Sequence, residues 1–436
     1  MNLIIHRGTK EIGGSCVELK SAKTRIIIDL GIPLVDIKDK TKKFNSFSLR
    51  KKTASQLLAS GVLPTVKGLY EGVDDGKSVD AFFLSHPHQD HYGFCQFIRK
   101  DIPVFLSRDA GRMLKAADVF LPVQFGKHKQ FFLKNHDSVD VGNMKITPYL
   151  MDHSGYGAMA FLVETEGKKI FYSGDFRGHG RKKDLFEKFL KSPPLGVNVL
   201  IMEGTMVDRA EESVDSEEQL ETKIVKEARS YPGAKFIFCS GQNVDRLVTF
   251  YRSARRLKAL FVLDLYTANI LHELMRKSMP VPSNGFKDVG ILFTKHFMKR
   301  LEQKKMPDWY KRWRRYEISP ASLRRKGGNL FVVYRERSQP ELEAAGIRPG
   351  SVLFYSQWGG YMEEPSFKPT ETFCQRHNMD IRQAHTSGHA TIRSLKRLGA
   401  ALNPQVIVPI HSFAANKFHE LFDNVRELDD KEVFKL

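Results

Sequence analysis

The strongest chemical signal in the sequence is a run of metal-binding side chains that follows the apolar stretch 81–84, namely His86-Pro87-His88-Gln89-Asp90-His91. In an extended segment, residues two apart point the same way, so His86 and His88 can share one cation. The turn that follows can direct Asp90 and His91 toward a second cation. A lone histidine is commonly an ordinary surface or core residue, but such a dense cluster favours metal binding. The run therefore predicts a loop that holds two metal ions, an arrangement suited to hydrolysis.

Further ligands are needed to fill two coordination shells, and three candidates follow predicted strands. The strands expected at 145–150, 169–173 and 405–410 run into His153, Asp175 and His411. The carboxyl ends of strands are where crevices form in layered α/β folds. We expect His153 to complete the first metal site, Asp175 to bridge the two cations and His411 to close the second site. Taken alone each could be a polar loop residue, but an acidic bridge would offset repulsion between divalent ions about 3.5 to 4 Å apart.

These motifs resemble those of metallo-β-lactamase-fold hydrolases, through the His-x-His-x-Asp-His loop, His153 and Asp175. Asp29, at the end of an apolar strand, is similar to an early aspartate of that family, which supports the site by hydrogen bonds. Segments 200–205, 385–390 and 408–411 resemble motifs of the narrower β-CASP nuclease group, which includes ribonuclease J. The resemblance covers nearly the whole chain, and it implies a metal-dependent nuclease.

The resemblance also implies roles for individual residues. Hydrolysis of a phosphodiester requires an activated water, stabilisation of charge on the phosphoryl oxygens and a proton for the departing sugar oxygen. Two divalent ions, held in part by Asp90 and Asp175, can activate the water and stabilise the charge on the phosphoryl oxygens. Zinc fits such ligands, with manganese or iron as alternatives. His389 is then the proton donor, oriented by Glu203. The simpler interpretation is that His389 caps an amphipathic helix with apolar positions 392, 395, 398 and 402.

Two segments are candidates for binding substrate phosphates, and their residues are His385, Ser387, Ser240, Asn243 and Arg246. His385 and Ser387 resemble family residues that grip a phosphate. The other three resemble an element that receives the 5′-monophosphate end of RNA in ribonuclease J-like enzymes. This chain departs from that element by carrying Gly241-Gln242 before Asn243. A plain strand-to-helix turn is the competing interpretation.

The composition independently favours a polyanionic partner. The chain has 69 Lys and Arg against 50 Asp and Glu, a formal charge of +19, which would attract nucleic acid. Residues 295–326 hold twelve basic and three acidic residues, interleaved with Trp309, Tyr310, Trp313 and Tyr316. These rings could stack on bases, but we favour a helix whose aromatic side chains face the core. Segment 38–52 is also basic and is expected to be a solvated loop.

The pattern of elements predicts an α/β protein, a four-layer αββα metallo-β-lactamase sandwich with an inserted Rossmann-like β-CASP domain. We expect the sandwich in residues 1–200, the insertion in 201–370 and a returning segment in 371–436, with the active site in the cleft between the domains. Further predicted strands are 24–29, 81–84, 235–239, 260–263 and 351–355. Helices are expected at 217–230 and 244–257.

Several features limit the setting in which the protein acts. No apolar stretch reaches the length of a membrane span, and residues 1–7 are too short for a signal peptide, so we expect a cytoplasmic protein without a membrane partner. The four cysteines lie far apart and favour neither a metal site nor a disulfide framework. We also expect the chain to lack the further C-terminal domain of typical ribonuclease J chains, and loop 356–361 departs from their pattern.

The leading hypothesis is a two-metal-dependent ribonuclease that acts on single-stranded nucleic acid, with RNA favoured over DNA. Cleavage from the 5′ end and internal cleavage both stay open, and a homo-oligomer is not indicated. The alternatives are a DNA-processing β-CASP nuclease, a small-molecule metallo-hydrolase such as a thioesterase, and a non-catalytic RNA-binding scaffold. Retention of every expected metal ligand disfavours the scaffold.

Overall fold

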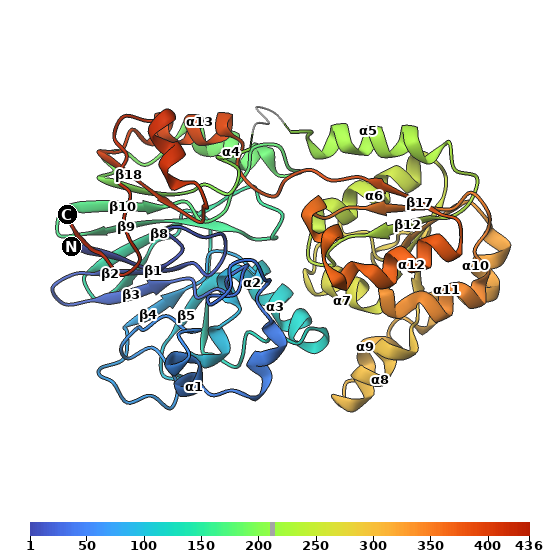
Figure 1. The fold of residues 1–436 in the computed structure, drawn as a ribbon, viewed down its shortest axis with the longest axis horizontal. Coiled ribbons are helices and arrows are strands. Elements are labelled where there is room, and N and C mark those ends of the chain that lie inside the picture. The colour runs from blue at the N-terminus through green and yellow to red at the C-terminus, as the bar shows by residue number, and fades with distance from the viewer. Residues whose placement is uncertain (210–213) are drawn as a thin grey trace. The chain divides into compact units, whose positions relative to one another are not determined.

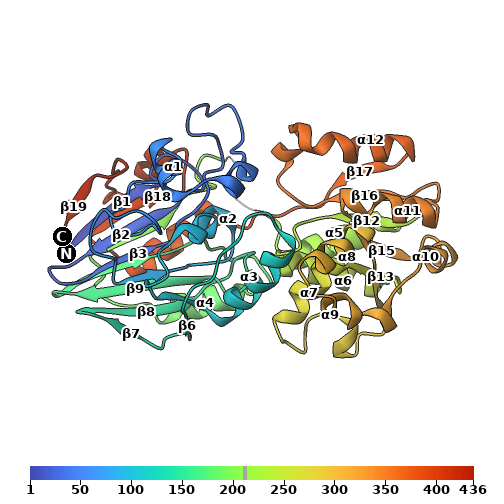
Figure 2. The same cartoon turned by 90° about the horizontal axis from the view of Figure 1, so that it is seen from below.

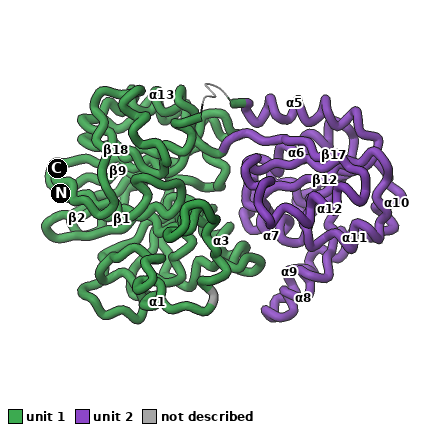
Figure 3. The backbone as a smooth tube through the Cα atoms, in the orientation of Figure 1, with its two compact units in different colours: residues 1–214, 388–436 green, residues 215–387 purple. Residues whose placement is uncertain are grey.

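The computed structural model, drawn in two views in Figures 1 and 2, describes residues 1–209 and 214–436. It divides the chain into two compact units, coloured in Figure 3. Unit 1 comprises Met1–Val214 and Gly388–Leu436, and unit 2 comprises Asp215–Ser387. His385 and Ser387 therefore lie in unit 2, whereas His389 lies in unit 1. The domain limits expected from the sequence stay a prediction.

Unit 1 contains two sheets that pack face to face. In spatial order the first sheet is β19 (Val433–Lys435), β1 (Asn2–Arg7), β2 (Cys16–Lys20), β3 (Arg25–Ile28), β4 (Ala81–Phe83), β5 (Val104–Ser107) and β6 (Gln130–Leu133). The second is β18 (Val406–Ile410), β11 (Val199–Glu203), β10 (Lys168–Tyr172), β9 (Met159–Thr165), β8 (Met144–Leu150) and β7 (Val139–Val141). One apolar cluster, which includes Ile26, Phe83, Phe161 and Ile201, fills the space between the sheets.

Helices cover the outer face of each sheet in unit 1. They are α1 (Ala54–Ala59), α2 (Gln89–Tyr92), α3 (Arg108–Phe120), α4 (Lys183–Lys191) and α13 (Ile392–Leu402). Leu57 of α1 and Leu114 of α3 pack on the first sheet, whereas Phe186 of α4 and Leu398 of α13 pack on the second. These helices lie on opposite sides of the paired sheets (Figure 1). The four-layer αββα prediction is confirmed.

Unit 2 is built on a parallel sheet with helices on both faces, as the predicted Rossmann-like insertion requires. The strand order is β14 (Val289–Leu292), β13 (Leu260–Asp264), β15 (Leu330–Val333), β12 (Lys235–Phe238), β16 (Val352–Tyr355) and β17 (Asp380–Gln383). The helices are α5 (Glu217–Ala228), α6 (Val244–Arg256), α7 (Leu265–Glu273), α8 (Lys295–Gln303), α9 (Asp308–Lys311), α10 (Pro320–Lys326), α11 (Gln339–Ala345) and α12 (Lys368–Arg376). Residues of α10, α11 and α12 share an apolar cluster with one face of the sheet.

Short 3-10 helices join the larger elements at Ser46–Lys51, Cys95–Phe97, Pro282–Asn284, Arg314–Tyr316, Glu336–Ser338, Gly359–Glu363, Pro365–Phe367 and Ala415–Glu420. Every strand and helix predicted by range lies within two residues of its observed bounds. Within the part of the chain that the structure describes, no helix combines the length and the apolar character needed to cross a membrane.

Candidate metal centre

The seven predicted metal ligands gather into two groups in unit 1. One group is His86, His88 and His153, and the other is Asp90, His91, Asp175 and His411. Within each group the potential ligand atoms lie within 4.8 Å of one another. The grouping matches the division expected from strand geometry, in which extended His86 and His88 face one position and the turn of α2 faces another.

Asp175 lies between the two groups. One of its carboxylate oxygens, Oδ2, is 3.2 Å from Nε2 of His91 and 3.7 Å from Nε2 of His86. Asp175 is buried, so its charge acts in a medium of low dielectric constant. This position suits the predicted role of a carboxylate shared by two cations.

Asp29 supports the histidine loop through hydrogen bonds. Its carboxylate accepts hydrogen bonds from Ser85 N at 2.7 Å, Ser85 Oγ at 2.6 Å and Tyr172 OH at 2.8 Å, and it lies 2.8 Å from Nδ1 of His91. With Nδ1 of His91 bound to Asp29, Nε2 is left to face the centre. Asp29 takes a backbone φ of 61°, a left-handed conformation that costs free energy outside glycine. The predicted supporting role of Asp29 agrees with this geometry.

Two other histidines are oriented through the same ring atom. Nδ1 of His153 lies 2.6 Å from the carbonyl oxygen of Gly388, and Nδ1 of His411 lies 2.8 Å from Oγ1 of Thr205. Both contacts leave Nε2 directed elsewhere. A Cβ added to Gly388 would lie 2.7 Å from Ser154 Oγ, so glycine permits this close approach of the backbone.

The electrostatics of the first group favour neutral imidazoles. Burial, reinforced by the neighbouring histidines, holds the pKa of His86 and of His153 well below the ordinary value. Burial also lowers the pKa of His88 to about 4. Metal ions bind the neutral form of imidazole. At neutral pH these three rings are therefore in the protonation state that a metal site requires.

The second group favours positive charge at its centre. Burial opposes a charge on His91, yet the carboxylates of Asp175 and Asp29 raise its pKa well above the ordinary value. Nε2 of His91 and of His411, and of His86 in the adjoining first group, is buried without a regular hydrogen bond among the described residues. Those of His91 and His411 lie 3.2 Å and 3.3 Å from carboxylate oxygens of Asp175 and Asp90. Buried polar atoms that lack partners are costly in a protein interior. A converging set of such atoms beside a carboxylate fits the donor set of divalent cations.

His389 and Glu203 lie at the edge of the second group. Nδ1 of His389 is 3.3 Å from Oε2 of Glu203 and 3.5 Å from Oδ2 of Asp175. Glu203 accepts backbone hydrogen bonds from Phe176, Thr205 and Ala390. Burial lowers the pKa of His389, but the carboxylates of Glu203 and Asp175 outweigh it and raise the pKa to about 9. The imidazole is therefore protonated at neutral pH.

The alternative interpretation of His389 as a helix cap does not match the geometry. Thr391 is the N-cap of α13, and its side chain accepts a hydrogen bond from the backbone N–H of Ser394. The ring of His389 lies instead near the rings of His153 and His411, at centroid distances of 5.5 and 5.7 Å.

The predicted phosphate-binding residues of unit 2 make internal hydrogen bonds. Asn243 caps α6 by accepting from the backbone N–H of Arg246, and Ser240 accepts from the N–H of Gln242. The guanidinium of Arg246 is fully buried and donates to Glu217 and to the carbonyl oxygen of Thr386. These bonds hold the segment after β17 against α6. Binding of phosphate by these residues, and by His385 and Ser387, stays a prediction.

The aromatic residues of the basic segment belong largely to the core. Trp309, Tyr310 and Trp313 are 7%, 8% and 1% exposed, whereas Lys311, Arg314 and Arg315 point to solvent. Nε1 of Trp313 donates to the side chain of Asn269. The rings of these three residues are therefore unavailable for stacking on bases, as the favoured interpretation of the sequence expects.

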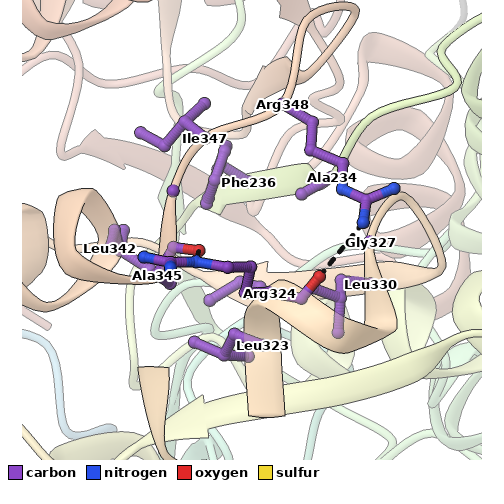
Figure 4. A pocket seen from close by; sticks show the side chains of 12 residues that line it. Ala234, Phe236, Leu323, Arg324, Gly327, Leu330, Leu342, Ala345, Ile347 and Arg348 are labelled. Atoms are coloured by element: carbon purple, nitrogen blue, oxygen red, sulfur yellow. Dashed lines mark hydrogen bonds between the residues drawn. The ribbon is translucent and has the colours of Figure 1, made fainter. Parts of the chain in front are cut away.

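An apolar pocket in unit 2 is lined in part by Phe236, Leu323 and Leu342 (Figure 4). Its volume is about 20 Å³, which is room for a water molecule and not for a nucleotide. Arg348 and Arg324 at its rim donate to backbone carbonyl oxygens. The pocket offers no second candidate site for the substrate.

Three residues of the centre were not predicted from the sequence: Ser85, Tyr172 and Thr205. Ser85 immediately precedes the histidine run, and Tyr172 and Thr205 lie within three residues of Asp175 and Glu203. Adjacency to a ligand motif is thus the signal that could have identified them, because neighbouring residues commonly orient metal ligands.

Comparison with known proteins supports the predicted fold class. Residues 59–228 match the model of the Beta-lactamase superfamily domain. A solved structure from Enterococcus faecalis V583, titled as a protein of unknown function, superposes with a TM-score of 0.77 at 19% identity and covers 100% of this chain and 99% of that one. The chain therefore has the metallo-β-lactamase fold.

Among curated proteins, Ribonuclease J of Mycoplasma genitalium is 24% identical over 93% of this chain and 66% of its own length. Ribonuclease J of Pyrococcus abyssi is 22% identical over 98% of this chain and 93% of its own. Cleavage and polyadenylation specificity factor 73 of Drosophila melanogaster is 23% identical over 62% of this chain and 41% of its own. The chain thus spans just under two thirds of the first relative. The predicted resemblance to β-CASP nucleases is confirmed, at low identity.

Proposed function

We propose that this chain is a two-metal-dependent ribonuclease that hydrolyses phosphodiester bonds of single-stranded RNA. The observation that carries the proposal is the convergence of seven metal-ligand side chains on two adjoining positions, with His389 and Glu203 beside them. Relatives named Ribonuclease J, and the formal charge of +19, support RNA as the polymer.

The ligand set would hold two divalent ions, for which zinc is the proposed metal. His86, His88 and His153 would hold one ion, and Asp90, His91 and His411 the other, with Asp175 shared between them. When bound, such ions supply an activated water and neutralise charge that develops on the phosphoryl oxygens. Asp29, Thr205 and the carbonyl of Gly388 fix the ring orientations, so that little rearrangement is needed during catalysis.

His389 supplies the remaining proton in this proposal. Its ring is protonated at neutral pH because the carboxylates of Glu203 and Asp175 raise its pKa to about 9 against the opposing effect of burial. Glu203 is fixed by backbone donors and lies beside Nδ1 of the ring, so Nε2 is the ring atom proposed to face the departing sugar oxygen. His389 then donates its Nε2 proton to that oxygen as the bond to phosphorus breaks.

The direct test uses end-labelled single-stranded RNA and DNA that carry 5′-phosphate, 5′-triphosphate or 5′-hydroxyl ends, with and without chelator. We expect RNA to be cleaved only when divalent metal is present. Mononucleotide release indicates cleavage from the 5′ end, whereas discrete fragments indicate internal cleavage. Preferential cleavage of DNA would support a DNA-processing enzyme instead. Absence of chelator-sensitive cleavage of both polymers would overturn the proposal.

The role of His389 is tested by His389→Ala, with the exposed His419→Ala as the matched control. General acid catalysis contributes about 100- to 10,000-fold, so we expect a loss of that order for His389→Ala and none for His419→Ala. Both proteins are compared at equal metal content. Unchanged hydrolysis by His389→Ala would remove this residue from the mechanism.

A further inference from the structure

An exposed pair of aromatic residues lies on β6, the edge strand of the first sheet in unit 1 (Figure 2). Phe131 and Phe132 are 38% and 44% exposed. An exposed apolar side chain is ordinary when it stands alone, but two adjacent phenylalanines on a sheet edge form a feature that requires an explanation. Successive residues of a strand face opposite sides of the sheet, so the two rings border the edge from both sides.

Both rings are held in place by the protein. Phe131 stacks on Phe105 with ring centroids 5.0 Å apart, and Phe105 stacks on Phe83 at 4.8 Å. Phe132 lies against α3, where a Cβ added to Gly111 would approach its ring to 2.8 Å. Rings that are fixed before a ligand arrives lose little conformational entropy on binding.

Positive charge surrounds the pair. Nζ of Lys129 lies 5.3 Å from the ring centroid of Phe131, and Cζ of Arg108 lies 5.4 Å from that of Phe132. Residues 121–136 contain three lysines, two histidines and no acidic residue. Among the described residues, no carboxylate forms an ion pair with Arg108, Lys127, Lys129 or Lys134, so their charge is available to an anionic ligand.

The strand register relates this edge to the metal centre within unit 1. Phe83 of β4 pairs with Phe105 of β5, which pairs with Phe131 of β6. The chain that leaves β4 reaches His86 three residues after Phe83. Since neighbouring strands are about 4.8 Å apart, β6 lies about 10 Å from β4 across the sheet. A strand of substrate with one phosphate at the metal centre can therefore reach the aromatic pair.

We propose that Phe131 and Phe132 form a two-sided stacking platform, with one ring on each face of β6, for unpaired bases of a single-stranded nucleic acid whose phosphates lie beside Arg108 and Lys129. Exposed rings next to cations are how proteins bind single strands without sequence preference. The inference rests on the proposed function in one respect, since RNA cleaved at the metal centre is taken to be the natural ligand. A second protein chain paired with β6 is the alternative occupant of this edge. The experiment below distinguishes it from a nucleic acid.

The test is binding of a fluorescently labelled single-stranded oligouridylate, followed by anisotropy in excess chelator so that cleavage cannot intervene. We expect Phe131→Ala and Phe132→Ala each to weaken binding about 5- to 150-fold, the range for loss of one stacked base. Phe131→Trp and Phe132→Trp keep an aromatic face and are expected to bind at least as well as the wild type. Leu195→Ala, which truncates an exposed apolar residue elsewhere in unit 1, is the matched control and is expected to change nothing.

For each variant, circular dichroism checks that the protein is folded, and sedimentation measures its oligomeric state. Unchanged affinity in folded alanine variants would overturn the inference, as would an equal loss of affinity for a duplex of the same length. A changed oligomeric state with unchanged affinity would identify a protein interface instead and would also overturn it. Hydrolysis of the small diester bis(p-nitrophenyl) phosphate reports the metal centre separately. If the wild type fails to cleave while the alanine variants lose binding, the platform stands and the proposed function fails.

Discussion

Two sets of polar residues, both predicted from the sequence to act in function, differ in how completely the fold satisfies them. In unit 1, buried ring nitrogens of His86, His91 and His411 converge near Asp175 without regular hydrogen bonds among the described residues. In unit 2, the buried guanidinium of Arg246 donates to Glu217, Ser356 and two backbone carbonyls. The polar atoms of the first set remain able to bind a ligand, whereas those of the second set are already hydrogen-bonded within the fold.

Motif similarity alone therefore does not tell whether the polar atoms of a residue are already hydrogen-bonded within the fold. A buried polar atom that lacks a partner is costly, so a converging group of them indicates a ligand. Removal of a buried arginine from a full set of acceptors leaves those acceptors unpaired and destabilises the structure around it. Substitutions in the two regions are therefore expected to change different measurements.

The largest expected effect is that of Asp175→Asn on cleavage. The carboxylate of Asp175 lies near a histidine of each group, so loss of its charge is expected to weaken binding of both ions. We expect cleavage of labelled RNA to fall at least about 10,000-fold, equivalent to roughly 5 kcal/mol in the barrier. Metal content measured on the same sample is expected to fall below that of the wild type. Full activity at full metal content would contradict the proposed role of Asp175 at the metal centre of unit 1.

Arg246→Met is expected to affect stability before activity. It removes the guanidinium and leaves Glu217 buried without that partner, which costs about 3 to 5 kcal/mol in the free energy of unfolding. Urea denaturation measures this change. Arg252→Met on the same helix removes an exposed guanidinium, while the buried Glu221 keeps its ion pair with Arg256, so this substitution is expected to cost less than about 1 kcal/mol. If Arg246→Met instead keeps full stability and loses only its preference for 5′-phosphorylated RNA, Arg246 is a phosphate-binding residue.

Asp29→Asn probes the support behind the centre. Loss of such an outer partner typically weakens metal affinity about 10- to 100-fold, and we expect that range in a competition titration against a chromogenic chelator. Tyr172→Phe removes one hydrogen bond to Asp29 and leaves its contact with His91, so its effect should be below tenfold. Equal effects of the two substitutions would contradict the assignment of His91 orientation to Asp29.

The smallest effect is expected at Glu18, a satisfied buried acid away from the centre. Burial raises its pKa, but hydrogen bonds from His6 and Arg25 outweigh that and lower it to about 2 from 4.5. The stability that Glu18 contributes is present above pH 4.5 and is lost as pH falls toward 2. Glu18→Gln should lower the unfolding free energy at pH 7 by about 1.5 kcal/mol and flatten its dependence on pH below 4.5. The half-buried Glu164, which pairs with Lys169, provides the control substitution Glu164→Gln, and an identical pH profile for both variants would refute this account.

The clustering of the candidate metal ligands could be predicted from the sequence because each follows an apolar strand, and strand ends in a layered fold meet at one edge. His86 and His153 are examples, since their strands could be recognised from local pattern alone. The burial of Arg246 could not be predicted in this way, because its acceptors come from α5 and from the segments after β16 and β17. Long-range partners of this kind depend on the packed structure.

The aromatic residues illustrate the same limit. Trp309 and Trp313 stand among cations in the sequence but are buried. Their segment folds back on α7, where Asn269 donates to the backbone carbonyl oxygen of Trp309 and accepts from the ring nitrogen of Trp313. Phe131 and Phe132 also stand among cations, yet β6 is an edge strand and leaves them exposed. Composition is similar in the two segments, and only the position of each in the fold separates them.

The most direct test of the central claim is the metal content of the purified protein, measured by elemental analysis and located by anomalous diffraction. The account predicts two divalent ions per chain, one beside His86, His88 and His153 and the other beside Asp90, His91 and His411, with Asp175 between them. Protein that binds no divalent ion at these residues after incubation with zinc or manganese would contradict it.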